Sequence, residues 1–301
     1  MSAFGARVSR LRAVSFRVAA LCVAVLCSTA AWAVGVHRAS PARAALGGGT
    51  DGAESIWAAV SVFSGQWVPG SFPCAWSPYA GGSSIDTIPP DGPPERMVNG
   101  VLHRLFIRVC PDAAVRAVWV PVVPPTFLAT AATNVLSRMV PRPAVHLAPP
   151  ADRGVVHVGM WFWTNPMQWV PVSVTAAVPT TTGVLWVTTT ATPTALIWWP
   201  GESRAVDDPR AGLPVVCAGP GLRWLAAFGD RWPSPTGCTY TYRHSSVRAP
   251  AGRAFSARLS IRWRVTWRSS TGAMGSGGQL LSSTASEVVV REIEALGVGE
   301  G

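Results

Sequence analysis

The chain has 301 residues, of which 49% are hydrophobic, so it is long enough for one or two domains with a substantial core. All 25 of its basic residues are arginine and 15 residues are acidic, which gives a formal net charge of +10. A chain without lysine lacks the lysine of a phosphate-binding P-loop and the amine for Schiff-base chemistry, so we expect neither a nucleotide nor another cofactor.

Residues 1–33 have the features of a secretory signal peptide. Four arginines precede an uncharged, mostly apolar run at 18–30, and an A-W-A cleavage pattern follows at 31–33. The apolar run is short for a membrane span, so we expect an exported protein, secreted or at the cell surface, rather than one held by an uncleaved signal anchor. Cleavage removes four arginines and no acid, and we expect the remaining positive excess to serve solubility, with attraction to acidic envelope polymers as the alternative. The arginines are scattered, so no nucleic-acid partner is expected.

Residues 34–53 are small, polar or glycine-rich and are predicted to be a linker, and a first module follows at 54–150. Its predicted strands are 56–63, 101–110 and 116–123, with a long loop of turn-forming residues at 78–96.

The first module also contains one predicted helix, at 124–139. Its apolar residues recur at helical spacing, at Leu128, Ala131, Ala132, Val135, Leu136 and Met139. Thr126 is the predicted N-cap. Four prolines make the next segment, 141–150, an extended connection, because proline has no amide donor and disfavours helix before it.

The second module, 151–298, is predicted to consist of strands. The segment 256–267 alternates without interruption between apolar and polar residues, which indicates a long strand with one solvated face. Shorter strands are predicted at 156–163, 172–178, 184–192, 195–199, 213–217, 238–242 and 285–296, the last of which could also be helical. The predicted fold class is mainly β, an antiparallel β-sandwich with a smaller amino-terminal α+β module.

Four cysteines remain after the signal peptide, an even number that favours disulfides in an oxidising compartment. Three pairings are possible, and we favour the one with a bond inside each half of the chain, Cys74–Cys110 and Cys217–Cys238. A zinc site is the alternative, although no C-x-x-C pair or nearby histidine supports it.

The chain resembles a known family in the order of seven motifs, which are W-F-W, V-S-V-T, LIWWPGES, VVCAGPG, CTYTYRHSS, RWRVTW and VVVREIEAL. It is similar to exported proteins of high-GC actinobacteria that carry a PKD-like (polycystic kidney disease-type) domain, an immunoglobulin-like sandwich. The resemblance covers about 155–296 and, more loosely, the first module. It implies the sandwich fold, and it supplies no catalytic residues.

Three motifs carry this resemblance. W-x-x-G-D-G is occupied by Trp198, Gly201, Glu202 and Ser203, with Glu in place of Asp, and C-x-G-P-G is matched by Cys217, Gly219, Pro220 and Gly221. C-x-H-x-Y is matched by Cys238 and Tyr242, but Tyr240 stands where histidine is usual. These two departures put the family's contact between the turn and the histidine in doubt.

No residue pattern indicates a reaction. His244 lies beside Ser245 and Ser246, but no G-x-S-x-G or S-x-x-K motif accompanies it. Asp207 and Asp208, with Glu202, offer too few oxygens for a calcium site, so no metal is expected. We therefore expect no enzymatic activity.

The tryptophans allow two interpretations. The first is an aromatic core containing most of the rings, including Trp161, Trp263 and Trp267. The second is an exposed stacking surface formed by Trp186 and Trp199. The leading hypothesis for function is an adhesion or protein-interaction module with an envelope protein as partner. The alternatives are binding of cell-wall carbohydrate polymer through the exposed tryptophans and an envelope hydrolase that uses His244.

Overall fold

The computed structural model describes residues 61–66, 74–80, 94–111, 113–203, 209–229, 233–249 and 253–293. The chain divides into a unit of residues 1–38 and a unit of residues 39–301, and every described residue belongs to the second. The predicted signal peptide and linker therefore lie outside the described residues.

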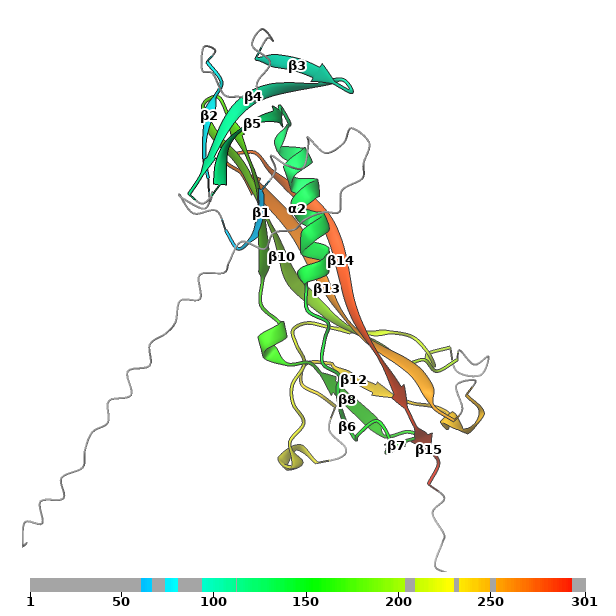
Figure 1. The fold of residues 1–301 in the computed structure, drawn as a ribbon. Coiled ribbons are helices and arrows are strands. Elements are labelled where there is room, and N and C mark those ends of the chain that lie inside the picture. Colours follow the sequence, from blue (N-terminus) through cyan, green and yellow to red (C-terminus); the bar gives the residue numbers. More distant parts are fainter. Residues whose placement is uncertain are drawn as a thin grey trace, which may run out of the picture. The chain divides into compact units, whose positions relative to one another are not determined.

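The largest sheet is antiparallel and is built around one long strand, β10 (Gly183–Trp199), with β13 (Phe255–Ser269) beside it (Figure 1). The strand order is β1-β9-β10-β13-β14, and β11 pairs with the end of β10. The bounds of the remaining strands are Ser61–Ser64 for β1, Val172–Thr180 for β9, Met274–Val288 for β14 and Val215–Cys217 for β11.

Strand β13 confirms the strand predicted at 256–267. Leu259, Ile261 and Trp263 are fully buried on one face, while Arg258 and Arg264 are exposed on the other. A period of two therefore separates the core from the solvated face along this strand, as an antiparallel sheet covered on one side requires.

Strand β10 joins two segments that the sequence predicts separately, 184–192 and 195–199. The pairing with β13 shifts its register between Pro193 and Ala195. Proline has no amide to donate to the ladder and is tolerated where a bulge interrupts the pairing, so the strand continues past it.

Strand β14 corrects the prediction for the carboxyl-terminal part of the chain. A strand was expected only from residue 285, but β14 begins at Met274 and pairs with β13 along its whole length. The glycines and serines at 275–278 have a low strand propensity, which the ladder to β13 overrides. Val290 and Arg291 form the short strand β15.

Helix α2 (Pro125–Met139) confirms the predicted helix and packs against β9 and β10 (Figure 1). The prediction of Thr126 as N-cap is wrong. The N-cap is Pro124, which makes no side-chain hydrogen bond to the helix. Pro125 follows it in the first turn, where backbone amides have no acceptor within the helix, so the missing amide of proline costs no hydrogen bond. The buried residues of the helix are Leu128, Ala129, Ala131, Ala132 and Leu136.

Three smaller sheets complete the described structure. Strands β2 (Ala75–Pro78), β3 (Glu95–Val98) and β5 (Ala113–Pro121) all pair with β4 (Val101–Cys110), which matches the predicted strand 101–110. The second sheet has the order β12-β8-β6, and in the third β15 pairs in parallel with β7. The bounds of these elements and of the 3-10 helices are β6 His146–Ala148, β7 Gly154–Val155, β8 Gly159–Trp163, β12 Thr239–Thr241, η1 Pro166–Gln168, η2 Ala226–Phe228 and η3 Ser246–Arg248.

Elements from both sides of residue 150 share one hydrophobic core. Strand β1 pairs with β9, β6 pairs with β8, and α2 lies on the main sheet. Strand β8 packs against β10 through Phe162 and Trp198, whose rings stack at 5.6 Å. The mainly β, antiparallel architecture is confirmed, whereas the structure does not separate an amino-terminal module at residue 150.

Two disulfides are present, with the pairing that the sequence analysis favours. Cys74–Cys110 joins the start of β2 to the end of β4, and Cys217–Cys238 joins the end of β11 to the residue before β12. These four cysteines are therefore not zinc ligands, and their oxidised state fits an oxidising compartment.

Candidate functional site

The buried carboxylate of Glu202 is the centre of the most extensive polar network that the structure describes. The chain leaves β10 at Trp199 and turns sharply at Gly201, whose φ is +72°. A Cβ at this position would lie 2.3 Å from the Ser256 carbonyl oxygen, so only glycine permits the turn past β13. The turn places Glu202 in the interior, where it is 6% exposed.

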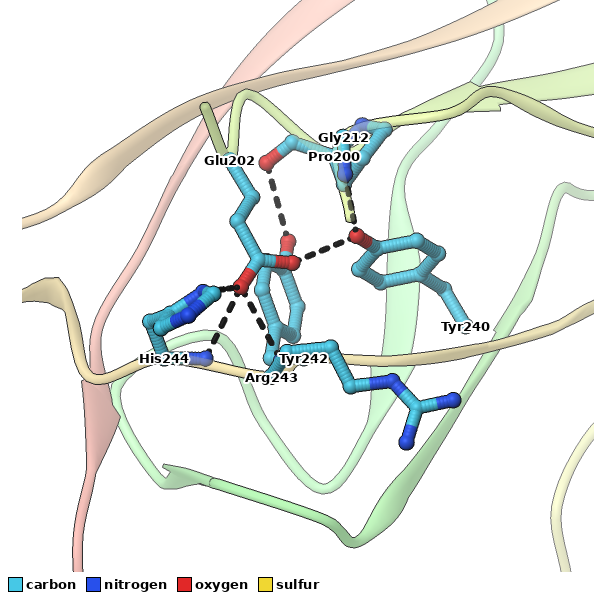
Figure 2. A network of polar contacts seen from close by, with 7 residues as sticks. All are labelled: Pro200, Glu202, Gly212, Tyr240, Tyr242, Arg243 and His244. Carbon is cyan, nitrogen blue, oxygen red and sulfur yellow. Dashed lines mark hydrogen bonds and ion pairs between the residues drawn. The ribbon is translucent and has the colours of Figure 1, made fainter. Parts of the chain in front are cut away.

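Three donors and the His244 imidazole surround the Glu202 carboxylate (Figure 2). The Tyr240 hydroxyl donates to Oε2 at 2.5 Å. Oε1 accepts from the backbone N–H groups of Arg243 and His244, at 3.0 and 2.8 Å, and contacts His244 Nδ1 at 3.0 Å. A buried carboxylate is costly unless it is hydrogen-bonded, and here both oxygens are engaged.

Two tyrosines connect this carboxylate to the surrounding chain. Tyr240 accepts a bond from the Gly212 amide at 2.9 Å, and Tyr242 donates to the Pro200 carbonyl at 3.1 Å. Burial raises the pKa of both phenols well above their ordinary value, and the hydrogen bond to Glu202 adds to the rise for Tyr240. Both hydroxyls therefore remain protonated donors near neutral pH.

The residues that carry the family resemblance converge on this region. Glu202 and Tyr240, the two departures from the family pattern, contact each other directly. The Pro220 carbonyl accepts from the Thr164 amide at 2.8 Å. Gly221 has a φ of +80°, and a Cβ there would meet the Phe162 carbonyl oxygen at 2.6 Å. These contacts hold loops together and involve no exposed cleft residue.

The geometry of His244 gives little support to a hydrolase. Its side chain is 45% exposed, and Glu202 holds Nδ1, as an orienting group holds a catalytic base. The Ser246 hydroxyl, however, is buried and donates to the Arg253 carbonyl at 2.6 Å. Within the described ranges no hydroxyl or thiol hydrogen-bonds to His244.

Three of the tryptophans that the structure describes are buried, and Trp76, Trp169 and Trp267 are partly buried against the core. Trp161, Trp198 and Trp263 are at most 2% exposed. Trp199 is 37% exposed, with the Arg258 guanidinium 5.3 Å from its ring centroid, and Trp186 is half-buried. Trp186 and Trp199 are 13 positions apart on one strand, about 43 Å at roughly 3.3 Å per residue, so the prediction that they form one stacking surface is wrong.

The solvated face of β13 forms a second candidate site, which we call the arginine face and define as Arg258, Arg262, Arg264 and Arg268. The register with β10 places Thr192 opposite Arg264, Thr190 opposite Thr266 and Thr188 opposite Arg268. Alternation in the sequence predicted a solvated face for Arg258, Arg262 and Arg264, whereas Arg268 lies beyond the predicted strand 256–267. The threonines beside them could not be found without the register between strands.

The charge of the arginine face is not neutralised by described residues. Arg268 donates to the Gln66 amide oxygen at 2.9 Å, and Arg258 covers Trp199. None of the four guanidinium groups forms an ion pair with a residue that the structure describes. A shallow hollow of about 420 Å³ opens on this face, lined by Thr188, Thr190, Thr266, Trp267, Arg268, Met274 and Gly275.

Other kinds of site find no support in the described part of the chain. It contains no group of three or more His, Cys, Asp or Glu side chains that could hold a metal ion. Asp207 and Asp208, weighed above as calcium ligands, lie outside it. Across the same ranges, no helix combines the length and apolar character needed to cross a bilayer. Comparison with family models, curated proteins and solved structures finds no match to this chain.

Proposed function

We propose that this protein is an exported, non-enzymatic envelope protein that adheres to acidic polymers through the arginine face. The single observation that carries the proposal is the row of four guanidinium groups on one sheet face without an ion-pair partner among the described residues. The ligand class is a polymer with repeated carboxylate or phosphate groups.

The spacing of the arginines suits a repeating anion. Arg262 and Arg264 are two residues apart on the same face, which is about 7 Å along a strand, and Arg268 follows after about 13 Å. Guanidinium groups bind carboxylates and phosphates through paired hydrogen bonds. The hydroxyls of Thr192 and Thr266, both exposed beside the arginines, add neutral donors.

Two further features support the non-enzymatic and exported parts of the proposal. Both oxygens of the Glu202 carboxylate accept hydrogen bonds that hold loops together. Two disulfides fit an oxidising compartment. The PKD-like identity belongs to the same proposal and is supported by the antiparallel β architecture alone.

The test compares two triple variants of the chain on immobilised polyphosphate and polyglutamate. In the first, Arg262, Arg264 and Arg268 become Gln, and in the control, the exposed Arg116, Arg138 and Arg248 become Gln, so net charge changes equally. Three exposed contacts of about 0.5 kcal/mol each give roughly tenfold weaker binding for the first variant. We expect the control to bind like the unaltered chain.

The same assay separates the competing functions. Equal losses in the two triple variants would show that net charge, not the arginine face, controls binding and would overturn the proposal. Retention on a neutral polysaccharide that is lost in Trp199→Ala would instead support carbohydrate binding through this tryptophan. Turnover of an ester, peptide or glycan that is lost in His244→Ala would overturn the non-enzymatic assignment.

A further inference from the structure

Strand β14 is the last strand of the main sheet, and its outer edge is not covered by described residues. Among the described residues, no backbone hydrogen bond joins β14 to an element other than β13, and the next residue after the strand, Val289, donates its amide to the Ala151 carbonyl. The segment 274–286 contains neither a charged residue nor a proline. Natural sheets usually protect a long edge with charges, prolines or bulges, because an unprotected edge recruits another strand.

The edge of β14 has one regular part that is suited to strand pairing. A bulge interrupts its pairing with β13 near Gly277, and from Gln279 to Glu287 the register is continuous. Leu281, in the middle of this part, is 61% exposed. The bulge protects the beginning of the β14 edge against strand pairing, and the nine residues from Gln279 to Glu287 remain available for it.

We infer that the occupant of this edge is a second copy of the chain, paired antiparallel with β14 about a two-fold axis at Ser283. In this pairing Gln279 lies opposite Glu287 of the second copy, and Leu281 lies opposite Ala285 of the second copy. All of these residues share the face that carries the arginines, because their partners on β13 are even-numbered residues from Ser256 to Arg264. The pairing is isologous, as a two-fold interface requires.

Charge complementarity favours a second copy over an arbitrary peptide. Glu287 is the only charged side chain that β14 contributes to this face. The pairing places the backbone of Glu287 two strand spacings, about 10 Å, from the backbone of Arg264 in the other copy. The two side chains are long enough to meet across this distance. The two-fold symmetry forms this contact twice. The two β13 strands lie about 14 Å apart, beyond the screening length of about 8–10 Å, so their arginines repel weakly.

The inference of a dimer does not require the polymer-binding proposal, although both use Arg264. It would join two main sheets edge to edge and place two arginine faces on one continuous surface.

The test measures the mass of the full chain in solution by analytical ultracentrifugation across a concentration series. Glu287→Arg and Arg264→Glu, each alone, should weaken dimerisation by about tenfold, and the two changes together should restore it. Leu281→Lys should also weaken it, since it places a charge at an apolar contact. Thermal melts of every variant verify that the exposed substitutions leave the fold intact.

A second readout uses Ser283→Cys, which should form a disulfide between two copies, while Ser276→Cys in the bulge should not. A chain that is monomeric at 100 μM, or a double variant no better than the single ones, would overturn the inference. Leu281→Asn separates the two proposals. A monomeric variant that still binds polyphosphate shows that the dimer alone is disrupted, whereas a dimeric chain that fails to bind refutes only the polymer proposal.

Discussion

Glu202 is the residue on which the loops after β10 and around β12 depend most. Its carboxylate is buried and accepts from one phenol and two backbone amides. Removing one donor leaves the oxygen that it served desolvated and without a partner, which costs more than the net value of an ordinary hydrogen bond.

We therefore predict that Tyr240→Phe lowers the free energy of unfolding by about 1–3 kcal/mol in a denaturant titration. Thr241→Val, on the same strand but outside the network, is the control. An unchanged midpoint in Tyr240→Phe would show that the bond from Tyr240 to Glu202 contributes nothing to stability.

The two buried tyrosines also predict a pH dependence. Their pKa values are raised in the folded protein, so above about pH 10 the unfolded chain releases protons that the folded chain retains. Their contribution to stability is thus fully present below pH 10 and is lost as the pH rises further, by up to about 1.4 kcal/mol per pH unit for each group. Ultraviolet titration of the native protein at pH 11 should detect two fewer phenolates than titration in denaturant, of three tyrosines in all. Native titration of all three at the ordinary pKa would contradict this.

At the level of elements, the Cys217–Cys238 bond joins β11 to the start of β12 and so holds the Glu202 network between them. It closes a loop with a sequence separation of 21. In the chain-entropy model such a bond stabilises by roughly 3 kcal/mol.

The double variant Cys217→Ser and Cys238→Ser should lose about this much stability in a denaturant titration. It should also lower protection of the amides of Arg243 and His244 in hydrogen exchange, because their acceptor Glu202 is no longer held in place. The pair Cys74→Ser and Cys110→Ser is the control, since it lies in another sheet. Unchanged protection of these amides would separate the disulfide from the network.

Sequence patterns predict some of these elements and miss others for physical reasons. Alternation identifies β13, and helical spacing identifies α2, because each pattern reflects one buried face. The first half of β14 is missed, since its glycines and serines acquire strand structure only from the ladder to β13. Continuity of β10 through Pro193 is missed for a similar reason, since a bulge depends on the neighbouring strand.

The candidate sites, like the helices and strands, were predicted only in part from the sequence. Glu202 and Tyr240 stood out in the sequence as departures from a motif, but their contact spans 38 positions and could not be read from spacing. Arg258, Arg262 and Arg264 were predicted to lie on a solvated face. Their isolation from described acids, and the threonines beside them, depend on register and on tertiary structure.

On the scale of the whole molecule, the protein combines two disulfides, a core with buried tryptophans and an arginine face that has no ion-pair partner among the described residues. The core contains Trp161, Trp198 and Trp263, whose buried rings are not available to a ligand. We therefore propose that the protein contacts acidic polymers through the positive charge of the arginine face, since exposed guanidinium groups concentrate anions near the sheet.

Modification of arginine by phenylglyoxal, with and without polyphosphate, tests this claim most directly. The chain contains no lysine, so trypsin cleaves only at arginine, and each modified site appears in mass spectra as a missed cleavage. Polyphosphate should protect Arg262, Arg264 and Arg268 while Arg116, Arg138 and Arg248 react as before. Uniform protection of all exposed arginines, or no protection on β13, would show that polyphosphate does not bind at the arginine face.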